Sequence, residues 1–224
     1  MTDPYYSDEN VTIYHGDCRE IMPELTFDVI VTDPPYGISW RSGGMPSGYT
    51  SGLNERKETY VIGDETTGIR DTVLEMRRGA PCIVFGSWKA SRPKDTDRVL
   101  IWNKSGQNPG PVNHPWFTAH EDIYLIGKGW TGKPHRSVIT TNENRSVAAS
   151  ASGHPTSKPV SLMITLVGKC PPGVILDPFM GSGTTLRAAK DLGRKAIGIE
   201  LDEKYCEIAA TRMGQGVLDF GATE

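Results

Sequence analysis

The feature that most constrains the fold of this chain is a β-branched run that ends in two consecutive prolines. Residues 27–32 have the composition of a buried strand, and Asp33 follows them directly, ahead of Pro34 and Pro35. Because proline has no backbone N–H to donate, two prolines in succession cannot continue a central strand. The strand must therefore end here, with Asp33 at its carboxyl end.

Strand-like and helix-like segments alternate along the rest of the chain, which is typical of an α/β fold with a mostly parallel sheet. The expected strands cover residues 11–14, 27–32, 81–85, 99–102, 122–126, 173–176 and 195–199, and the expected helices cover residues 18–24, 67–78, 159–170, 184–192 and 202–213. A chain of 224 residues is long enough to bury a full core. We therefore expect a single α/β domain spanning residues 1–224.

Composition excludes several classes of protein. The apolar runs are short and interrupted, so we expect no transmembrane helix, and the polar, acidic start does not resemble a secretory signal. The four cysteines are scattered without a CxxC pair, so neither a metal site nor a disulfide framework is expected. A reducing, cytoplasmic location fits this composition best.

Charge is unevenly distributed along the chain. Residues 86–160 carry ten Lys or Arg against five Asp or Glu, although the whole chain has a net charge of -3. A basic surface on an otherwise acidic protein is typical of a site that binds the phosphate groups of nucleic acid. A solvated surface of mixed charge is the alternative.

The segment 174–192 has the pattern of a nucleotide-binding strand, turn and helix. Gly181 and Gly183 would let the backbone approach a ligand closely, and Glu200, at the end of the next strand, is placed to receive ribose hydroxyls. Asp177 ahead of the turn would repel a pyrophosphate, and the third glycine of a dinucleotide fingerprint is missing. The turn therefore favours a cofactor with an adenosine and a positive charge over NAD, and a purely structural glycine turn is the alternative.

Taken together, the motifs resemble those of a known family. Residues 176–185, Leu-Asp-Pro-Phe-Met-Gly-Ser-Gly-Thr-Thr, resemble the S-adenosyl-L-methionine (SAM) binding motif of DNA amino-methyltransferases, and residues 33–36, Asp-Pro-Pro-Tyr, resemble their catalytic motif. Residues 154–159 and the Gly16-Asp17 segment resemble two further family segments. The catalytic motif precedes the cofactor motif, which resembles the β class of these enzymes. The resemblance implies a Rossmann-like methyltransferase fold with seven strands, helices on both faces and circularly permuted motifs.

The resemblance also assigns roles to individual residues. It implies that Asp17 lies near the adenine of SAM, that Glu200 holds the ribose, and that Lys158 pairs with the cofactor carboxylate. The catalytic residues it implies are Asp33, Pro34, Pro35 and Tyr36, and the remaining cofactor-binding residues are Asp177, Phe179, Gly181, Ser182, Gly183, Thr184 and Thr185, with Asp33 also beside the cofactor. For Lys158, a solvated lysine at the start of a helix is the alternative.

The chemistry of adenine N6 suits these residues. The lone pair of this amine is delocalised into the ring, so the site must draw it back to nitrogen. The Asp33 carboxylate and the Pro34 carbonyl can accept the two N–H protons, which stabilises the transition state electrostatically. Tyr36 would offer a flat face to a base flipped out of the duplex.

Target recognition is less defined. The candidates are loops inserted at 40–63 and 106–153, and the expected phosphate contacts are Lys128, Lys133, Arg136 and Arg145. We expect DNA as the partner, a short or loose recognition sequence, a homodimer, and a role such as restriction–modification.

Three alternatives stay open at this point. An Asp at the first position of the tetrapeptide favours adenine N6, and cytosine N4 is the first alternative. A DNA-binding homologue without catalysis is the second, and an RNA or protein substrate is the third.

Overall fold

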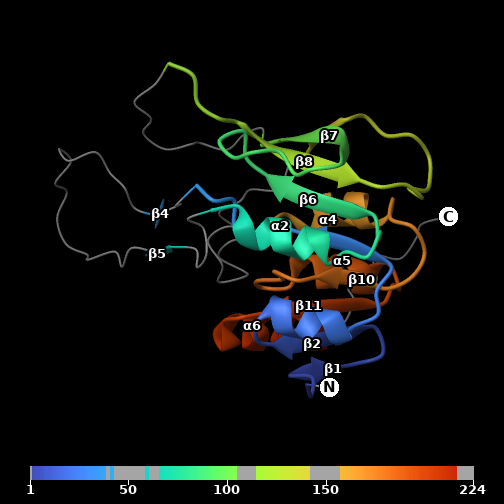
Figure 1. The fold of residues 1–224 in the computed structure, drawn as a ribbon. Helices are drawn as coiled ribbons and strands as arrows, with labels where there is room; N and C mark the ends of the chain where they lie inside the picture. The colour runs from blue at the N-terminus through green and yellow to red at the C-terminus, as the bar shows by residue number, and fades with distance from the viewer. Residues whose placement is uncertain are drawn as a thin grey trace.

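The computed structural model describes residues 2–38, 66–104, 115–141 and 157–215, together with two short strands at 41–42 and 59–60 (Figure 1). Its strands are β1 (Tyr6–Ser7), β2 (Val11–His15), β3 (Val29–Thr32), β4 (Arg41–Ser42), β5 (Thr59–Tyr60), β6 (Cys82–Gly86), β7 (Thr96–Asn103), β8 (His120–Ile126), β9 (Val138–Thr140), β10 (Ile175–Asp177) and β11 (Ala196–Glu200). Its helices are α1 (Cys18–Ile21), the 3-10 helix η1 (Met22–Glu24), α2 (Gly68–Glu75), α4 (Val160–Val167), α5 (Thr184–Asp191) and α6 (Glu203–Gly214).

The main sheet of the described chain has nine strands in the order β1-β2-β11-β10-β3-β6-β8-β7-β9. Five neighbouring strands, from β2 to β6, run parallel. Strand β8 is inserted between β6 and β7 and runs antiparallel to both. The mostly parallel α/β fold predicted from the sequence is therefore confirmed.

The predicted number of seven strands is wrong for the described residues. The main sheet gains β1, which is only two residues long, and β9, which lies in a polar stretch predicted to be irregular. The separate pair β4–β5 falls inside the segment 40–63 that was predicted to be a loop. Strands of two or three residues are too short for alternation of apolar and polar side chains to mark them.

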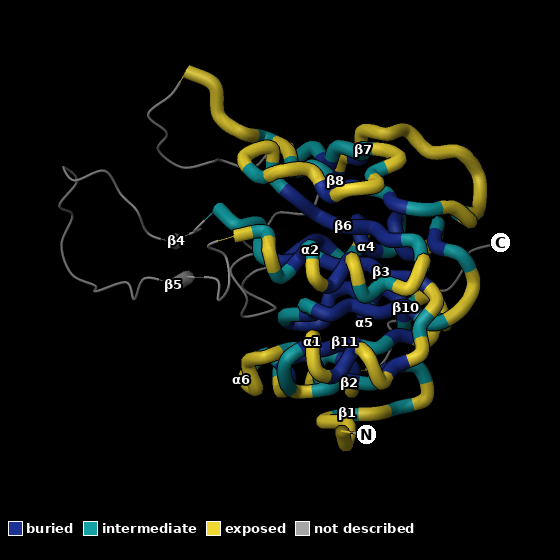
Figure 2. Tube along the Cα trace, in the orientation of Figure 1, coloured by how far each residue is buried: buried dark blue, intermediate teal, exposed yellow. Residues whose placement is uncertain are grey.

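Helices cover both faces of the sheet because the strand residues alternate between two cores. Val29 and Val31 pack in a core with residues of α4, α5 and α6, whereas Ile30 packs in the other core with residues of α1, η1 and α2. Figure 2 shows that the central strands β3, β6 and β10 are buried along their length. Two-sided burial explains why their sequences are continuous apolar runs.

Helix α4 shows how the apolar pattern positions the site. Its buried residues are Leu162, Met163, Leu166 and Val167, whose spacing places them on one face of the helix. Packing of this face fixes the start of α4, and with it the preceding residue Lys158. Within the described residues, no helix is long and apolar enough to cross a membrane.

Candidate active site

Four neighbouring parallel strands lead into carboxylates at one edge of the sheet. Glu200 ends β11 and Asp177 ends β10, whereas Asp33 follows β3 directly and Asp17 follows β2 after one intervening residue. The carboxyl ends of parallel strands are where α/β folds bind ligands. The structure therefore brings together four residues that the sequence assigned to the site, and we call this side of the sheet the carboxyl edge.

The turn between β10 and α5 is shaped by two glycines. Gly181 and Gly183 have φ angles of 51° and 76°, in the left-handed region that side chains other than glycine rarely adopt. A Cβ added to Gly183 would lie 3.0 Å from the Cβ of Ala209 in α6. The backbone N–H of Gly181 donates to Oε2 of Glu200 at 2.9 Å, so the turn is fastened to the end of β11.

Asp177 is buried between the turn and the neighbouring strand. Its Oδ1 accepts hydrogen bonds from Thr32 Oγ1 at 2.8 Å and from the backbone of Phe179 at 3.2 Å, and its Oδ2 accepts one from Thr185 Oγ1 at 2.5 Å. Only 2% of the residue is exposed. Burial raises the pKa of the Asp177 carboxyl to about 7, against the lowering effect of these donors.

Glu200 and Asp17 lie at the ends of two paired strands. The backbone N–H of Gly16 donates to the carbonyl of Glu200 at 2.9 Å, and the N–H of Asp202 donates to the Glu200 carboxylate at 2.9 Å. Burial raises the pKa of Glu200. Asp17 caps α1 by accepting from the backbone N–H of Arg19 at 2.9 Å, and hydrogen bonds from the Arg19 side chain lower the pKa of Asp17.

The tetrapeptide after β3 is held by its own tyrosine. The hydroxyl of Tyr36 lies 2.6 Å from Oδ1 of Asp33 and 3.2 Å from Oε2 of Glu121, within donating distance of both. Burial raises the pKa of Tyr36 well above its usual value, with further contributions from the charges of Asp33 and Glu121. The phenol therefore stays protonated and available as a donor at neutral pH.

Lys158 continues this network as a buried cation. Its Nζ donates to Oδ2 of Asp33, lies 3.3 Å from Oε2 of Glu121, and donates to the Tyr36 hydroxyl at 3.3 Å. Lys104 bonds to the other oxygen of Glu121. The result is an alternating chain of charges, Asp33–Lys158–Glu121–Lys104, which we call the charged cluster, and its formal charges sum to zero.

Sequence reasoning missed two residues of the charged cluster, Glu121 and Lys104, as site residues. It also missed Phe85, the aromatic residue that contacts the cluster. Glu121 is the second residue of β8, and Lys104 directly follows β7. The ring centroid of Phe85 in β6 lies 4.9 Å from the Lys158 ammonium. The sequence did contain a signal for both charged residues. Lys104 comes just after the expected strand 99–102, and Glu121 comes just before the expected strand 122–126. Their meeting depends on the insertion of β8 between β6 and β7, which no local pattern indicates.

Two predicted hydroxyl residues of the turn, Ser182 and Thr184, are hydrogen-bonded to other side chains of the protein. The buried hydroxyls of Ser182 and Ser157 lie 3.0 Å apart, and Thr184 accepts from Arg212 at 3.1 Å. Lys158 is paired with Asp33 and Glu121, and its pairing with a cofactor carboxylate stays a prediction. These contacts fix the turn and the cluster relative to each other.

The predicted phosphate contacts do not gather near Asp33. Lys128 and Lys133 lie in the connection from β8 to β9, which contacts the turn ahead of β10 through a bond from Lys169 Nζ to the Lys133 carbonyl. That turn lies at the amino ends of the parallel strands, opposite the carboxyl edge. Arg136 is exposed just ahead of the edge strand β9, and Arg145 lies outside the described residues.

Comparison with solved structures places this fold among DNA methyltransferases. The PvuII DNA methyltransferase (cytosine-N4-specific) is 16% identical, with a TM-score of 0.67, and the match covers 97% of this chain and 91% of that one. The complex of M1.HpyAVI with SAM is 22% identical, with a TM-score of 0.61, and the match covers 90% of this chain and 99% of that one. At this identity the two structures show the shared fold.

Sequence comparison identifies the family. The type II methyltransferase M.ScaI of Streptomyces caespitosus is 28% identical over 94% of this chain and 83% of its own length. The family model described as DNA methylase, for N6 and N4 methyltransferases, matches residues 87–211. Since this match takes in more than half of the sequence, the chain belongs to the N6/N4 DNA methylase family.

Proposed function

We propose that this DNA methyltransferase transfers the methyl group of SAM to N6 of adenine in DNA. The observation that carries the proposal is the hydrogen bond from Thr32 to Asp177, at 2.8 Å. It joins the strand that leads into the candidate catalytic Asp33 to the strand that leads into the candidate cofactor turn. A methyl donor and an acceptor amine bound at these two strand ends would be neighbours.

The residues at the carboxyl edge fit a cofactor that is a nucleoside and a cation. The carboxylates of Asp177 and Glu200 are held by neutral donors, namely threonine hydroxyls and backbone N–H groups. Asp33, in contrast, is paired with Lys158. In their ionised form the carboxylates of Asp177 and Glu200 are hydrogen-bonded to neutral donors, which suits a cofactor that brings a positive charge of its own. M1.HpyAVI, which shares the fold, has been crystallised with SAM.

We assign the binding of SAM to the turn and to the two strand ends beside it. Gly181 and Gly183 give the cofactor close access to the backbone, Glu200 accepts from its ribose hydroxyls, and Asp17 lies toward its adenine. The remaining members of this proposed set are Asp177, Phe179, Ser182, Thr184 and Thr185. When bound, SAM supplies a methyl group that is already activated on a positively charged sulfur.

Asp33 then acts on the target amine. Tyr36 occupies one oxygen of its carboxylate and Lys158 the other, but a carboxylate has about four lone-pair sites, so capacity for a further N–H remains. The carbonyl of the buried Pro34 accepts the second amine proton on a backbone made rigid by Pro35. Together they hold the amine in the geometry in which its lone pair faces the methyl group.

The target base must leave the duplex to reach Asp33, because its amine is inaccessible inside the helix. Tyr36 is half-buried and supplies a ring against which such a base can stack. The Asp at the start of the tetrapeptide favours adenine over cytosine, by resemblance to family members. Cytosine N4 is the competing assignment, because the PvuII enzyme with the same fold is specific for it.

The test uses SAM carrying a labelled methyl group and three acceptors: bacterial genomic DNA, RNA and protein. We expect label in DNA alone, and mass analysis of the digested nucleosides should give N6-methyl-2′-deoxyadenosine. N4-methylcytosine would overturn the assignment of the base, and label in RNA or protein would overturn the proposed substrate.

Asp33→Ala serves as the matched catalytic variant. It should bind SAM like the parent protein and lose turnover. Full activity in this variant would remove Asp33 from the catalytic role. The homodimer, the loose recognition sequence and the contacts of Arg136 and Arg145 with phosphate stay predictions.

A further inference from the structure

Three exposed aromatic side chains lie on two segments that meet at the carboxyl edge. Trp88 follows β6, whereas Trp116 and Phe117 precede β8, and the three residues are 61%, 82% and 52% exposed. Because β6 and β8 pair antiparallel, with Gly86 opposite Asp122, the end of one strand meets the start of the other. The indole N–H of Trp88 donates to Oγ1 of Thr118 at 3.3 Å, which joins the two segments.

This aromatic patch, defined as Trp88, Trp116 and Phe117, continues the strands of the charged cluster. Strand β6 carries Phe85, whose ring contacts Lys158, three residues before Trp88. Strand β8 carries Glu121, which lies against Tyr36, three residues after Thr118. The patch is therefore built on the same two strand ends that support the proposed catalytic residues.

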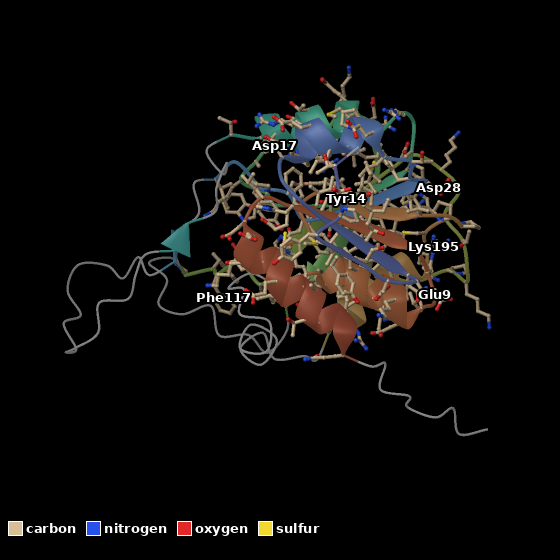
Figure 3. All side chains as sticks on the ribbon, turned by 90° about the horizontal axis from the view of Figure 1, so that it is seen from below. Glu9, Tyr14, Asp17, Asp28, Phe117 and Lys195 are labelled. Atoms are coloured by element: carbon tan, nitrogen blue, oxygen red, sulfur yellow. The ribbon has the colours of Figure 1, made fainter. Side chains whose placement is uncertain are left out.

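The figures show where the segment that carries Phe117 lies. Figure 2 shows the segment leading into β8 as an exposed tube that projects beyond the sheet. In Figure 3, Phe117 lies on the same side of the molecule as Asp17, away from Asp28, Lys195 and Glu9, which precede their strands.

The chemistry of the patch favours unstacked nucleic-acid bases as its occupant. Large flat rings bind bases through their faces, with little dependence on sequence. The ammonium of Lys89 lies 5.8 Å from the centroid of the Trp88 ring, so a positive charge for a phosphate lies beside a stacking surface.

We propose that the aromatic patch stacks against bases that lose their neighbours when the target base leaves the duplex. Flipping one base leaves its partner and the adjacent bases with open faces, and aromatic or apolar side chains at such a step can replace the lost stacking. Trp116, the most exposed of the three, is the principal contact. This inference rests on the proposed function, because only an extruded base creates those open faces beside Asp33.

The test measures binding of a fluorescein-labelled, mixed-sequence, single-stranded 20-nucleotide DNA to Trp116→Ala. Affinity should fall about ten- to a hundredfold, the range of a lost base–aromatic stack. Trp116→Phe, which keeps a ring, should retain most of the affinity. Leu192→Ala removes an exposed apolar side chain at the end of α5 and should bind like the parent protein. Because Trp116 is so exposed, its truncation removes no core packing.

Two readouts separate stacking from charge. The slope of affinity against salt concentration should be the same for Trp116→Ala and the parent, since no phosphate contact is lost, whereas Lys89→Ala should lower the slope. An abasic oligonucleotide of the same length offers no base to stack, so the parent and Trp116→Ala should bind it equally. An equal loss of affinity on normal and abasic DNA would overturn the stacking role.

Two further outcomes separate base stacking from self-association, and this inference from the proposed function. If Trp116→Ala binds DNA like the parent but converts a dimer to a monomer in sedimentation, the patch is a self-association surface and the proposal is wrong. Methyl transfer by the parent protein to pooled duplex DNA is measured alongside. Methylation of DNA combined with unchanged binding by Trp116→Ala removes this inference alone, whereas absence of methylation removes the proposed function.

Discussion

The ammonium group of Lys158 donates a hydrogen bond to the carboxylate of Asp33, although the two residues lie 125 positions apart in the chain. The Lys158 side chain is 7% exposed, and it lies 3.3 Å from a second carboxylate, that of Glu121. A buried cation shared by two carboxylates offsets their mutual repulsion and fixes their orientation. We therefore infer that Lys158 acts on the proposed reaction through Asp33, as a positioning residue.

Replacing Lys158 with Met should expose this dependence. The two carboxylates lose their shared cation, so the free energy of unfolding should fall by about 3 kcal/mol. Misplacement of Asp33 should lower kcat about 100-fold. Adding Asp33→Asn to Lys158→Met should restore part of the stability, because one of the uncompensated charges is gone. Urea denaturation of the parent, both single variants and the double variant measures this coupling.

Lys190→Met is the control for this cycle. Lys190 is paired with Asp8 on the far side of the sheet, so its loss should lower stability without lowering kcat. Additive losses of stability in the Asp33 and Lys158 variants would contradict the coupling, and full activity of Lys158→Met would contradict the positioning role.

Much of this arrangement could be predicted from local sequence. Two prolines ended β3 where predicted, and α4 lies within the range predicted for a helix, residues 159–170. In both cases the information lies within one turn or one strand: a missing N–H in the first, a helical repeat of apolar residues in the second. The carboxylates at the ends of β2, β3, β10 and β11 met at one edge because parallel strands share their direction.

The rest depended on which strands became neighbours. Strand β8 enters between β6 and β7 in the antiparallel direction, and only this order brings Glu121 to Tyr36 and Lys104 to Glu121. Such contacts are set by tertiary packing between segments far apart in the chain, which a local pattern does not encode.

Glu121→Gln tests the part of the cluster that sequence reasoning missed. The substitution keeps the shape of the side chain and removes its charge, which leaves the ammonium groups of Lys104 and Lys158 without the anion between them. We expect kcat to fall about tenfold, from weaker orientation of Tyr36 and Lys158, with the affinity for SAM unchanged. Steady-state kinetics and SAM calorimetry separate the two effects.

Glu75→Gln in α2 is the matched control for Glu121→Gln. It makes the same change of charge at an exposed position and should leave kcat unaltered. Equal kcat in the two variants, or a loss of SAM affinity in Glu121→Gln, would show that Glu121 does not act through the tetrapeptide.

Asp177 should make stability depend on pH. Its pKa of about 7 in the folded protein is above its ordinary value of 3.8, so the folded state holds a proton that the unfolded state releases between these values. The free energy of unfolding should therefore fall as pH rises from about 4 to about 7 and stop changing from this cause above 7. Asp177→Asn cannot ionise and should lack this contribution. Urea denaturation of both proteins without SAM, at half-unit steps of pH, gives the difference curve, and a flat difference would contradict the assignment.

Gly183→Ala, compared with Gly193→Ala, separates backbone strain from crowding at the cofactor turn. Both glycines are left-handed, with φ angles of 76° and 64°, so each substitution should cost about 1–2 kcal/mol of stability. The new methyl group at 183 would also lie 3.0 Å from the Cβ of Ala209, whereas nothing lies within 4 Å of one at 193. Gly183→Ala should therefore lose at least about 1 kcal/mol more of its free energy of unfolding, measured by urea denaturation.

Gly183→Ala should also bind SAM more weakly by calorimetry, because the turn must shift away from α6. Gly193→Ala should bind SAM like the parent. Equal stability losses and equal SAM affinities in the two variants would mean that close packing of the turn on α6 does not shape the cofactor site.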